Sequence, residues 1–250
     1  MLTRQLGIYR SMIGSLNYFA VASRYDIAHS VSRLSQFADK PTRSSKRALQ
    51  RVLQYLMVVP DLKIEVTRRD GADTFKFYSD SDHGGDQPHT TKSQTGSMIL
   101  LNDAPVHWTS KKQTDHTAYS SAMAEIFALS ETVRASRLYA WRAEEMGLVI
   151  TYPLRVQVDN KASISFQHNT CLQSRLRGCI DMRAAWVTEL REKGAIITEK
   201  VATEDNFADL LTKCFPSYKF KKLLRKIQGR SQETERVQAF IAHIVERYDD

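Results

Sequence analysis

The hydrophobic positions of the first sixty residues recur at the spacing of amphipathic helices. Apolar side chains repeat three or four residues apart, which is the period of one helix face. Such runs cover about 9–20, 27–38 and 49–56. Thr42 or Ser44 is placed to cap the third helix, and Val59 is placed to end it, because a residue before proline avoids helical backbone. We therefore predict a small helical region over 1–61.

From residue 62 onward the pattern changes to short strands that alternate with helices. Strands are predicted where short runs are rich in aromatic and β-branched residues or alternate between apolar and polar side chains. They cover 75–80, 97–101, 106–109, 154–158 and 195–201. Helical spacing predicts helices over 117–146, 161–167, 180–193 and 203–213, the last of them with Thr203 as its N-cap.

The order of these elements predicts how the strands pair. Short turns join the first three strands, which favours antiparallel pairing. The long helix before the fourth strand favours a crossover and parallel pairing. We therefore expect an α/β fold over 62–216, in which helices flank a mixed five-stranded sheet. The helical region 1–61 precedes it, and a basic helical tail over 217–250 follows it.

Basic residues outnumber acidic ones, and the net charge of +8 favours a polyanionic partner such as nucleic acid. They gather in two clusters, although a solvated helix face is the alternative explanation for each. The first cluster is Lys40, Arg43, Lys46, Arg47 and Arg51. The second is Lys213, Lys219, Lys221, Lys222, Arg225, Lys226 and Arg230, with no acid between 213 and 230.

Other classes of protein are disfavoured by what the sequence lacks. It has no run of about 18 apolar residues, so no membrane partner is expected. The sequence has no apolar leader of the kind that directs secretion. Its three cysteines, Cys171, Cys179 and Cys214, have no C-x-x-C spacing. We expect an intracellular protein without a zinc site. Whether it lies in the cytoplasm or the nucleus, and whether Met1 is a natural start, stay open.

Four acidic residues stand at the ends or inner faces of the predicted elements. Asp80 and Asp159 end two strands, and would project from one edge of the sheet if those strands are neighbours. Glu125 lies within the apolar stripe of the long helix, where a buried carboxylate is costly unless it is paired or binds a metal. Asp209 lies on the last helix. Each acid alone is more simply a cap, turn or surface charge, but together they favour a metal site.

Clustered carboxylates suit hard divalent cations such as Mg²⁺, with Mn²⁺ as a substitute. Two such ions held about 4 Å apart can activate a water molecule and stabilise the leaving oxygen of a phosphodiester. We therefore expect two ions at the four acids.

Six ordered blocks resemble the ribonuclease H region of copia-type retrotransposon Pol polyproteins. They are Tyr78-Ser79-Asp80-Ser81-Asp82, Lys92-Ser93-x-Thr95-Gly96, Trp108-Thr109-Ser110-Lys111-Lys112-Gln113, Ser120-Ser121-x-x-Ala124-Glu125, Asp159-Asn160-x-Ala162-Ser163 and Ala208-Asp209-Leu210-Leu211-Thr212-Lys213. Upstream, Tyr9–Leu16, Asp26–Ala28 and Lys40–Thr42 resemble the segment that joins reverse transcriptase to ribonuclease H. The resemblance covers about 7–227.

The resemblance implies a ribonuclease H-like fold and metal-dependent cleavage of the RNA strand of RNA–DNA hybrids. The catalytic and metal-binding acids would be Asp80, Glu125, Asp159 and Asp209, with Asp82 as the alternative to Asp80. Substrate binding is assigned to Ser81, Asn160, Lys111, Lys112 and Lys213. The chain has no Tyr-x-Asp-Asp block, so we expect no polymerase site in it and name a reverse transcriptase domain as a partner.

Three departures from the family pattern support an alternative function. His83 stands where tryptophan is frequent, Met123 replaces an acid, and Gly178-Cys179 replaces a Lys-His pair that could assist proton transfer. The chain could therefore be an inactive nucleic-acid-binding remnant of a retrotransposon polyprotein. Another nuclease on the same fold is a further alternative, and cleavage of duplex DNA would distinguish it.

Overall fold

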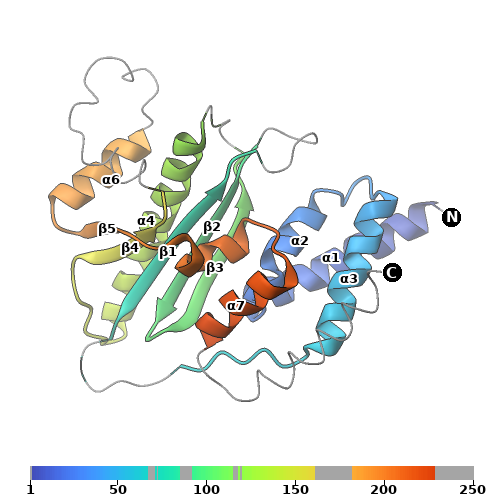
Figure 1. Cartoon of the computed structure of the whole chain (residues 1–250), viewed down its shortest axis with the longest axis horizontal. Helices are drawn as coiled ribbons and strands as arrows, with labels where there is room; N and C mark the ends of the chain where they lie inside the picture. Colours follow the sequence, from blue (N-terminus) through green and yellow to red (C-terminus); the bar gives the residue numbers. More distant parts are fainter. Residues whose placement is uncertain are drawn as a thin grey trace. The chain divides into compact units, whose positions relative to one another are not determined.

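The computed structural model describes residues 2–66, 71, 73–84, 92–114, 118, 120–160 and 182–228, with side chains from residue 6 (Figure 1). The chain divides into two compact units. The helical unit comprises 1–65 and 215–250, and the sheet unit comprises 66–214. No helix in the described ranges is long and apolar enough to cross a membrane.

The helical unit is built from amphipathic helices, as the hydrophobic spacing predicts. They are α1 (Leu2–Ala22), the 3-10 helix η1 (Tyr25–Ile27), α2 (Ala28–Ser35), α3 (Arg43–Val58) and α7 (Ser217–Gln228). Of the two predicted caps of α3, Thr42 is confirmed, because its Oγ1 accepts the backbone N–H of Ser45 at 3.0 Å. The predicted end of this helix is also confirmed, since Val59 is its C-cap.

The helical unit contains a buried ion pair between Arg24 and Asp26. Arg24 donates hydrogen bonds to both carboxylate oxygens of Asp26, at 2.9 and 2.7 Å, and to the carbonyl oxygen of Val59 at 2.7 Å. The hydroxyl of Tyr55 donates to Asp26 at 2.7 Å. Buried charges are tolerated only when they are paired and hydrogen-bonded. This network therefore ties the turn before α2 to the end of α3.

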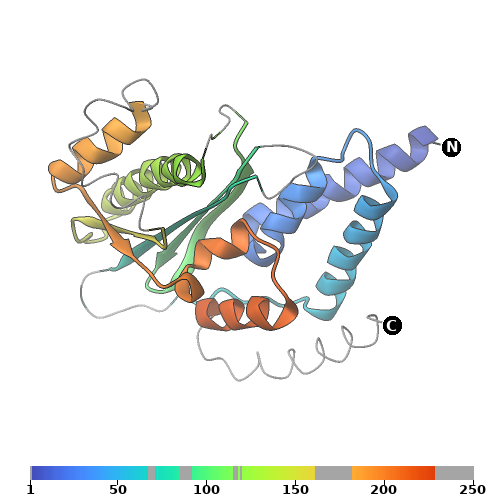
Figure 2. The same cartoon turned by 45° about the horizontal axis from the view of Figure 1, so that its top comes forward.

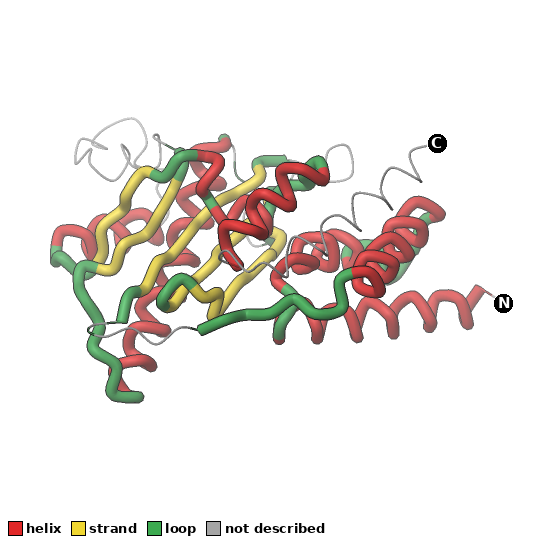
Figure 3. Tube along the Cα trace, turned by 60° about the horizontal axis from the view of Figure 1, so that its bottom comes forward, coloured by secondary structure: helices red, strands yellow, loops and turns green. Residues whose placement is uncertain are grey.

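The predicted mixed five-stranded sheet is confirmed (Figure 3). Its strands are β1 (Phe75–Asp82), β2 (Gln94–Leu101), β3 (Ala104–Lys112), β4 (Leu154–Val158) and β5 (Ile196–Lys200). Their order across the sheet is β3-β2-β1-β4-β5. β1, β2 and β3 pair antiparallel, whereas β4 pairs parallel with β1 and with β5. The crossover through the long helix therefore places β4 beside β1.

Helices cover both faces of this sheet (Figure 2). One face carries α4 (Ser121–Glu145), against which α6 (Met182–Glu192) packs, and the other carries the 3-10 helix η3 (Phe207–Leu211). The two faces of β1 show this division. Phe75 and Phe77 are buried in the core that includes Leu129 of α4. Tyr78 packs instead on Phe207 of η3, with ring centroids 4.8 Å apart.

The prediction of one helix over 203–213 is wrong. The segment forms two 3-10 helices, η2 (Thr203–Asp205) and η3, separated by an extended residue, Asn206. The Oδ1 atom of Asn206 accepts the backbone N–H of Ala208 at 3.3 Å, so Asn206 is the cap of η3. Thr203 caps nothing, because the N-cap of η2 is Ala202 without a side-chain hydrogen bond.

The other predicted elements need smaller corrections. The long helix begins at Ser121 rather than at 117, because Ser120 is its N-cap and accepts the backbone N–H of Met123 at 3.2 Å. The predicted helix over 161–167 and the tail beyond 228 lie outside the described residues.

Gly96 of β2 faces η3 across a very short distance. A Cβ atom at this position would lie 2.6 Å from Cγ2 of Thr212 and 2.7 Å from the backbone oxygen of Ala208. Gly96→Ala is therefore expected to lower the free energy of unfolding by about 1–3 kcal/mol, as overpacking does. Urea denaturation measures this. Gly14→Ala is the control, because nothing lies within 4 Å of its added Cβ. A Gly96→Ala protein as stable as the parent would contradict this close contact.

Candidate metal centre

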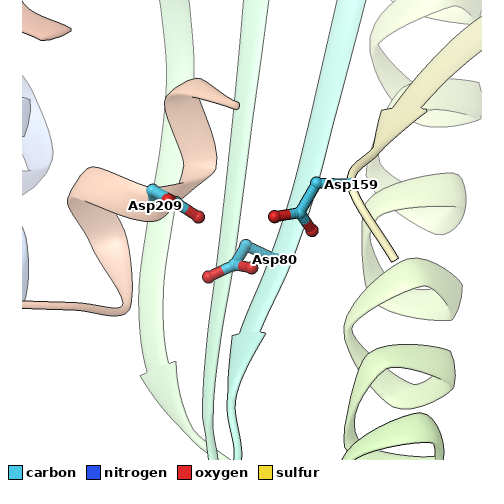
Figure 4. Close-up of side chains that lie close together, drawn as sticks. All are labelled: Asp80, Asp159 and Asp209. Carbon is cyan, nitrogen blue, oxygen red and sulfur yellow. The ribbon is translucent and has the colours of Figure 1, made fainter. Parts of the chain in front are cut away.

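Three aspartates from three different elements meet at one edge of the sheet (Figure 4). Asp80 lies on β1, Asp159 directly follows β4, and Asp209 lies on η3. One carboxylate oxygen of each lies within 4.8 Å of the others. Asp80 and Asp159 come together because β1 and β4 are parallel neighbours, whose carboxyl ends share an edge. The condition that the sequence left open is therefore met.

Asp80 is the most deeply buried of the three, with 1% of its surface exposed. Burial raises the pKa of Asp80 to about 7, and the charge of Asp209 adds to this rise. Burial also raises the pKa of Asp209. Like charges at this spacing and depth repel one another, so the cluster favours the binding of protons or of a cation.

Lys213 supplies a cation to two of the carboxylates. Its Nζ atom lies 3.1 Å from Oδ1 of Asp80 and 2.8 Å from Oδ1 of Asp209. Burial alone would lower the pKa of Lys213, but these two carboxylates raise it well above its ordinary value. Thr212, the preceding residue, donates a hydrogen bond from its hydroxyl to Oδ2 of Asp80. Both oxygens of Asp80 are therefore engaged by the segment that follows η3.

Glu125 borders this cluster from α4. It is 8% exposed, so the prediction that this acid faces the interior is confirmed. Burial raises the pKa of Glu125 to about 8, and the charges of Asp80 and Asp159 contribute to the rise. Its carboxylate is not one of the three oxygens that lie within 4.8 Å of one another. Glu125 is thus close enough to interact electrostatically but stands apart from the closest group.

The structure also places the alternative first acid and the predicted sugar-binding residues. Asp82 is half-buried and, among the described residues, does not belong to the group of three. Ser81 is buried and lies on the opposite face of β1 from Asp80, because side chains alternate along a strand. Asn160 is half-buried directly after Asp159. Whether Ser81 and Asn160 bind substrate stays a prediction.

The three lysines that are predicted to bind substrate lie in two places. Lys111 and Lys112 end β3, at the sheet edge that also carries Asp80. Lys213 contacts the acids themselves. His83 is exposed, and its Nε2 lies 3.2 Å from the carbonyl oxygen of Ala118. Gly178 and Cys179 lie outside the described residues.

Two residues that support the centre were not singled out from the sequence. Asn206 is fully buried, and its Nδ2 donates to the carbonyl oxygen of Ser79 at 3.1 Å, which fastens η3 beside Asp80. Thr212 fixes the carboxylate of Asp80. The sequence does offer one indication of the role of Asn206, since asparagine is a preferred helix N-cap. Thr203, three residues earlier, is an equally suitable cap residue, and it led to the prediction of a single helix.

The donor set suits a hard divalent cation. The group of three offers only carboxylate oxygens, which are the ligands that Mg²⁺ and Ca²⁺ prefer. The repulsion among the buried carboxylates is a further reason for a cation to bind there. The residues present therefore fit a metal of the kind that the resemblance implies.

No protein-family model matches the chain. The chain is 32% identical over 219 residues to the retrovirus-related Pol polyprotein from transposon RE2 of Arabidopsis thaliana. This match covers 88% of the chain and 15% of the polyprotein. The chain is also 40% identical over 126 residues to secreted RxLR effector protein 161 of Plasmopara viticola. This match covers 50% of the chain and 87% of that protein.

The sequence predicts a ribonuclease H-like fold with a mixed five-stranded sheet, and this sheet is present with the order β3-β2-β1-β4-β5. The solved structure of LC11-RNase H1, isolated from compost by a metagenomic approach, matches 55% of the chain and 91% of its own length. The identity is 15% and the TM-score is 0.41. The same protein has been crystallised with an RNA/DNA hybrid, and that structure matches with a TM-score of 0.39.

The raised pKa of Glu125 predicts how stability depends on pH without metal. A carboxyl group whose pKa is raised by folding contributes stability that is full below its ordinary pKa and is lost as pH rises through the folded value. For Glu125 this window runs from its ordinary value of 4.5 to about 8. Glu125→Gln should therefore equal the parent near pH 5 in EDTA. Near pH 8.5 it should be more stable, on the order of a few kcal/mol.

Urea denaturation at several pH values measures this difference. Glu145→Gln is the matched control, because Glu145 is exposed at the other end of α4. If the free energies of unfolding of the parent and of Glu125→Gln changed in parallel from pH 5 to 8.5, the assigned environment of Glu125 would be wrong.

Proposed function

Because this chain belongs to the copia-type retrotransposon Pol polyproteins, we propose that it is a ribonuclease H that cuts the RNA strand of RNA–DNA hybrids. The observation that carries the proposal is the group of Asp80, Asp159 and Asp209 at the edge of a ribonuclease H-like sheet. The chain spans only about 15% of the length of the curated polyproteins it matches. A reverse transcriptase domain is accordingly its proposed partner.

The proposed domain organisation follows the resemblance. Residues 1–61 form the end of a reverse transcriptase and its connection, 62–216 form the ribonuclease H domain, and 217–250 form a basic tail. The catalytic acids are Asp80, Glu125, Asp159 and Asp209. Two magnesium ions, or manganese ions in their place, would be held there. When bound, they supply Lewis-acid stabilisation of the charge that develops on the phosphodiester.

The protein's own residues have separate roles in this proposal. Thr212 and Lys213 orient the carboxylate of Asp80, and Lys213 balances the charge of the acids in the metal-free protein. Glu125 would help to hold one of the ions, and its carboxylate can accept a hydrogen bond from a ribose 2′-hydroxyl. Such a contact distinguishes RNA from DNA. In this proposal Ser81 and Asn160 contact the same ribose.

One observation favours the second candidate, an inactive nucleic-acid-binding remnant. Lys213 already pairs with Asp80 and Asp209, so these acids are partly neutralised without any metal. The departures at His83 and Met123 point the same way. The cleavage experiment separates the two candidates.

That experiment incubates the full chain with a labelled RNA–DNA hybrid and magnesium. We expect cutting of the RNA strand, and expect Asp159→Asn to reduce it to background while binding of the hybrid persists. Asp103→Asn is the matched control, because it makes the same chemical change in an exposed turn. Binding without any cutting would instead support the remnant, and cutting of duplex DNA would support a different nuclease.

The pairing of Lys213 predicts the response of the protein to metal. In Lys213→Met the buried carboxylates lose their counter-ion, so the free energy of unfolding in EDTA should fall by roughly 1–3 kcal/mol, less than for a fully buried pair. Added magnesium no longer has to displace an ammonium group and should raise Tm more than it does in the parent. Lys193→Met is the control, because Lys193 is exposed on the turn after α6. Equal magnesium-induced shifts would contradict this role.

A further inference from the structure

The end of β3 lies between the two elements that carry the outer acids of the metal centre. α4, with Glu125, covers one face of the sheet, and η3, with Asp209, covers the other (Figure 2). Ser110 lies on β3 and Gln113 directly follows it, and their side chains make hydrogen bonds toward opposite faces. Both belong to the block Trp108–Gln113, in which only the two lysines have an assigned role. The two polar side chains therefore still need an explanation.

Ser110 fastens η3 to the sheet. Its Oγ donates to the carbonyl oxygen of Leu211 at 2.5 Å and accepts from Nε2 of Gln94 at 2.9 Å. The last carbonyl groups of a helix have no partner within the helix, so a side chain of this kind can satisfy one of them. Leu211 ends η3, two residues after Asp209. Ser110 and Gln94 thus connect the segment that carries Asp209 to β3 and β2.

Gln113 fastens α4 to the sheet from the other face. Its Nε2 donates to Oγ1 of Thr95 at 2.9 Å and to the carbonyl oxygen of Ala124 at 3.0 Å. Its backbone N–H donates to the carbonyl oxygen of Ser93 at 2.8 Å, so Gln113 is itself held at the start of β2. Ala124 directly precedes Glu125. The side chain therefore ties the backbone beside Glu125 to a central strand.

The orientation of the Gln113 amide lowers stability in one respect. Its Nε2 makes both bonds, whereas its Oε1 is buried and makes no hydrogen bond with any residue that the structure describes. A buried acceptor without a partner costs free energy. An apolar side chain of similar length would avoid this cost but could not hold the carbonyl group of Ala124. The position that Gln113 imposes on α4 therefore explains it better than added stability does.

The outer acids need such support because like charges repel one another. Asp80, Asp159 and Asp209 lie within 4.8 Å of one another. η3 has only five residues, and the hydrogen bonds of a 3-10 helix have poorer geometry than those of an α-helix. A metal site works only if its ligands are held to within about 0.5 Å of the required geometry. Hydrogen bonds to paired strands supply this restraint.

We propose that the end of β3 positions two acids of the metal centre, one on each face of the sheet. Ser110 holds Asp209 through η3, and Gln113 holds Glu125 through α4. The inference rests on the proposed function, since it assumes that these acids bind the metal. Each residue acts through a backbone carbonyl group close to one acid. Replacing either residue is therefore expected to disturb one acid and to spare the other.

The first test measures hydrogen exchange of the backbone amides of the full chain in EDTA. Ser110→Ala should speed exchange about 10-fold at 209–213, as the loss of one hydrogen bond does, and leave 124–128 unchanged. Gln113→Met should do the reverse. If both variants sped exchange equally in both segments, the two residues would support general stability only, and the proposal would be overturned.

Ser136→Ala is the matched control for this measurement. The hydroxyl of Ser136 is buried and donates to the carbonyl oxygen of Val133 at 2.8 Å, within the same helix. Its removal also deletes a buried hydrogen bond to a carbonyl group but disconnects no other element. We expect exchange at 124–128 and at 209–213 to match the parent. A control that sped either segment as much as the test variants would contradict the assigned roles.

The second test measures Mn²⁺ binding by calorimetry in double-mutant cycles. Ser110→Ala and Gln113→Met should each weaken binding about 10-fold, as loss of a residue that orients a metal ligand does. Ser110→Ala should have no further effect in Asp209→Asn but should keep its effect in Glu125→Gln. For Gln113→Met the two backgrounds should exchange roles. The same loss in every background would show a structural role alone and would overturn the proposal.

Failure of this inference is distinguishable from failure of the proposed function. Exchange is measured without metal and Mn²⁺ binding without nucleic acid, so a protein that never cuts RNA still shows whether the two residues position the acids. In a protein that cuts the hybrid, both variants should lower kcat about 10-fold and leave KM near that of the parent. Variants with the kcat of the parent would overturn the positioning role while the proposed function stands.

Discussion

Repulsion among closely spaced carboxylates is the constraint on which the sheet unit depends. Asp80, Asp159 and Asp209 are brought within 4.8 Å of one another, and Glu125 adds a fourth acid nearby. Such an arrangement persists only if a cation or protons balance it. The polypeptide supplies one cation itself, since Lys213 lies four residues after Asp209 on the same segment. That segment must be seated firmly, and Gly96, Asn206 and Thr212 are the residues that allow its close approach to β1 and β2.

Side chains alternate between the two faces of β1, so one face contributes to the apolar core and the other to the acid cluster. Phe75 and Phe77 enter the core under α4, whereas Tyr78 and Asp80 face η3. The same alternation on β2 turns Gly96 toward η3 and Ser97 toward the face covered by α4. The face of the sheet beneath α4 therefore holds the apolar core, whereas the face beneath η3 carries Asp80.

The sequence predicts those features that depend on local pattern or on element order. The strands, the cap at Thr42, the burial of Glu125 and the meeting of Asp80 with Asp159 follow from periodicity and from the parallel crossover. The break at Asn206 does not follow, because it depends on a hydrogen bond to Ser79, a residue 127 positions away. The pairing of Lys213 with Asp80 spans 133 positions, so no helix or strand pattern could reveal it.

The position of η3 at the end of the sheet unit has a consequence for the order of assembly. Asp209, Thr212 and Lys213 are the last parts of this unit in the chain, and their partners lie on its first strand. Contacts between such distant segments form late in folding, after the loop between them has closed. During synthesis from the N-terminus, β1 and β4 are complete before η3 exists. The acid centre is thus completed only when the whole unit has been made, so a shortened chain would carry two of its aspartates without the third and without their counter-ion.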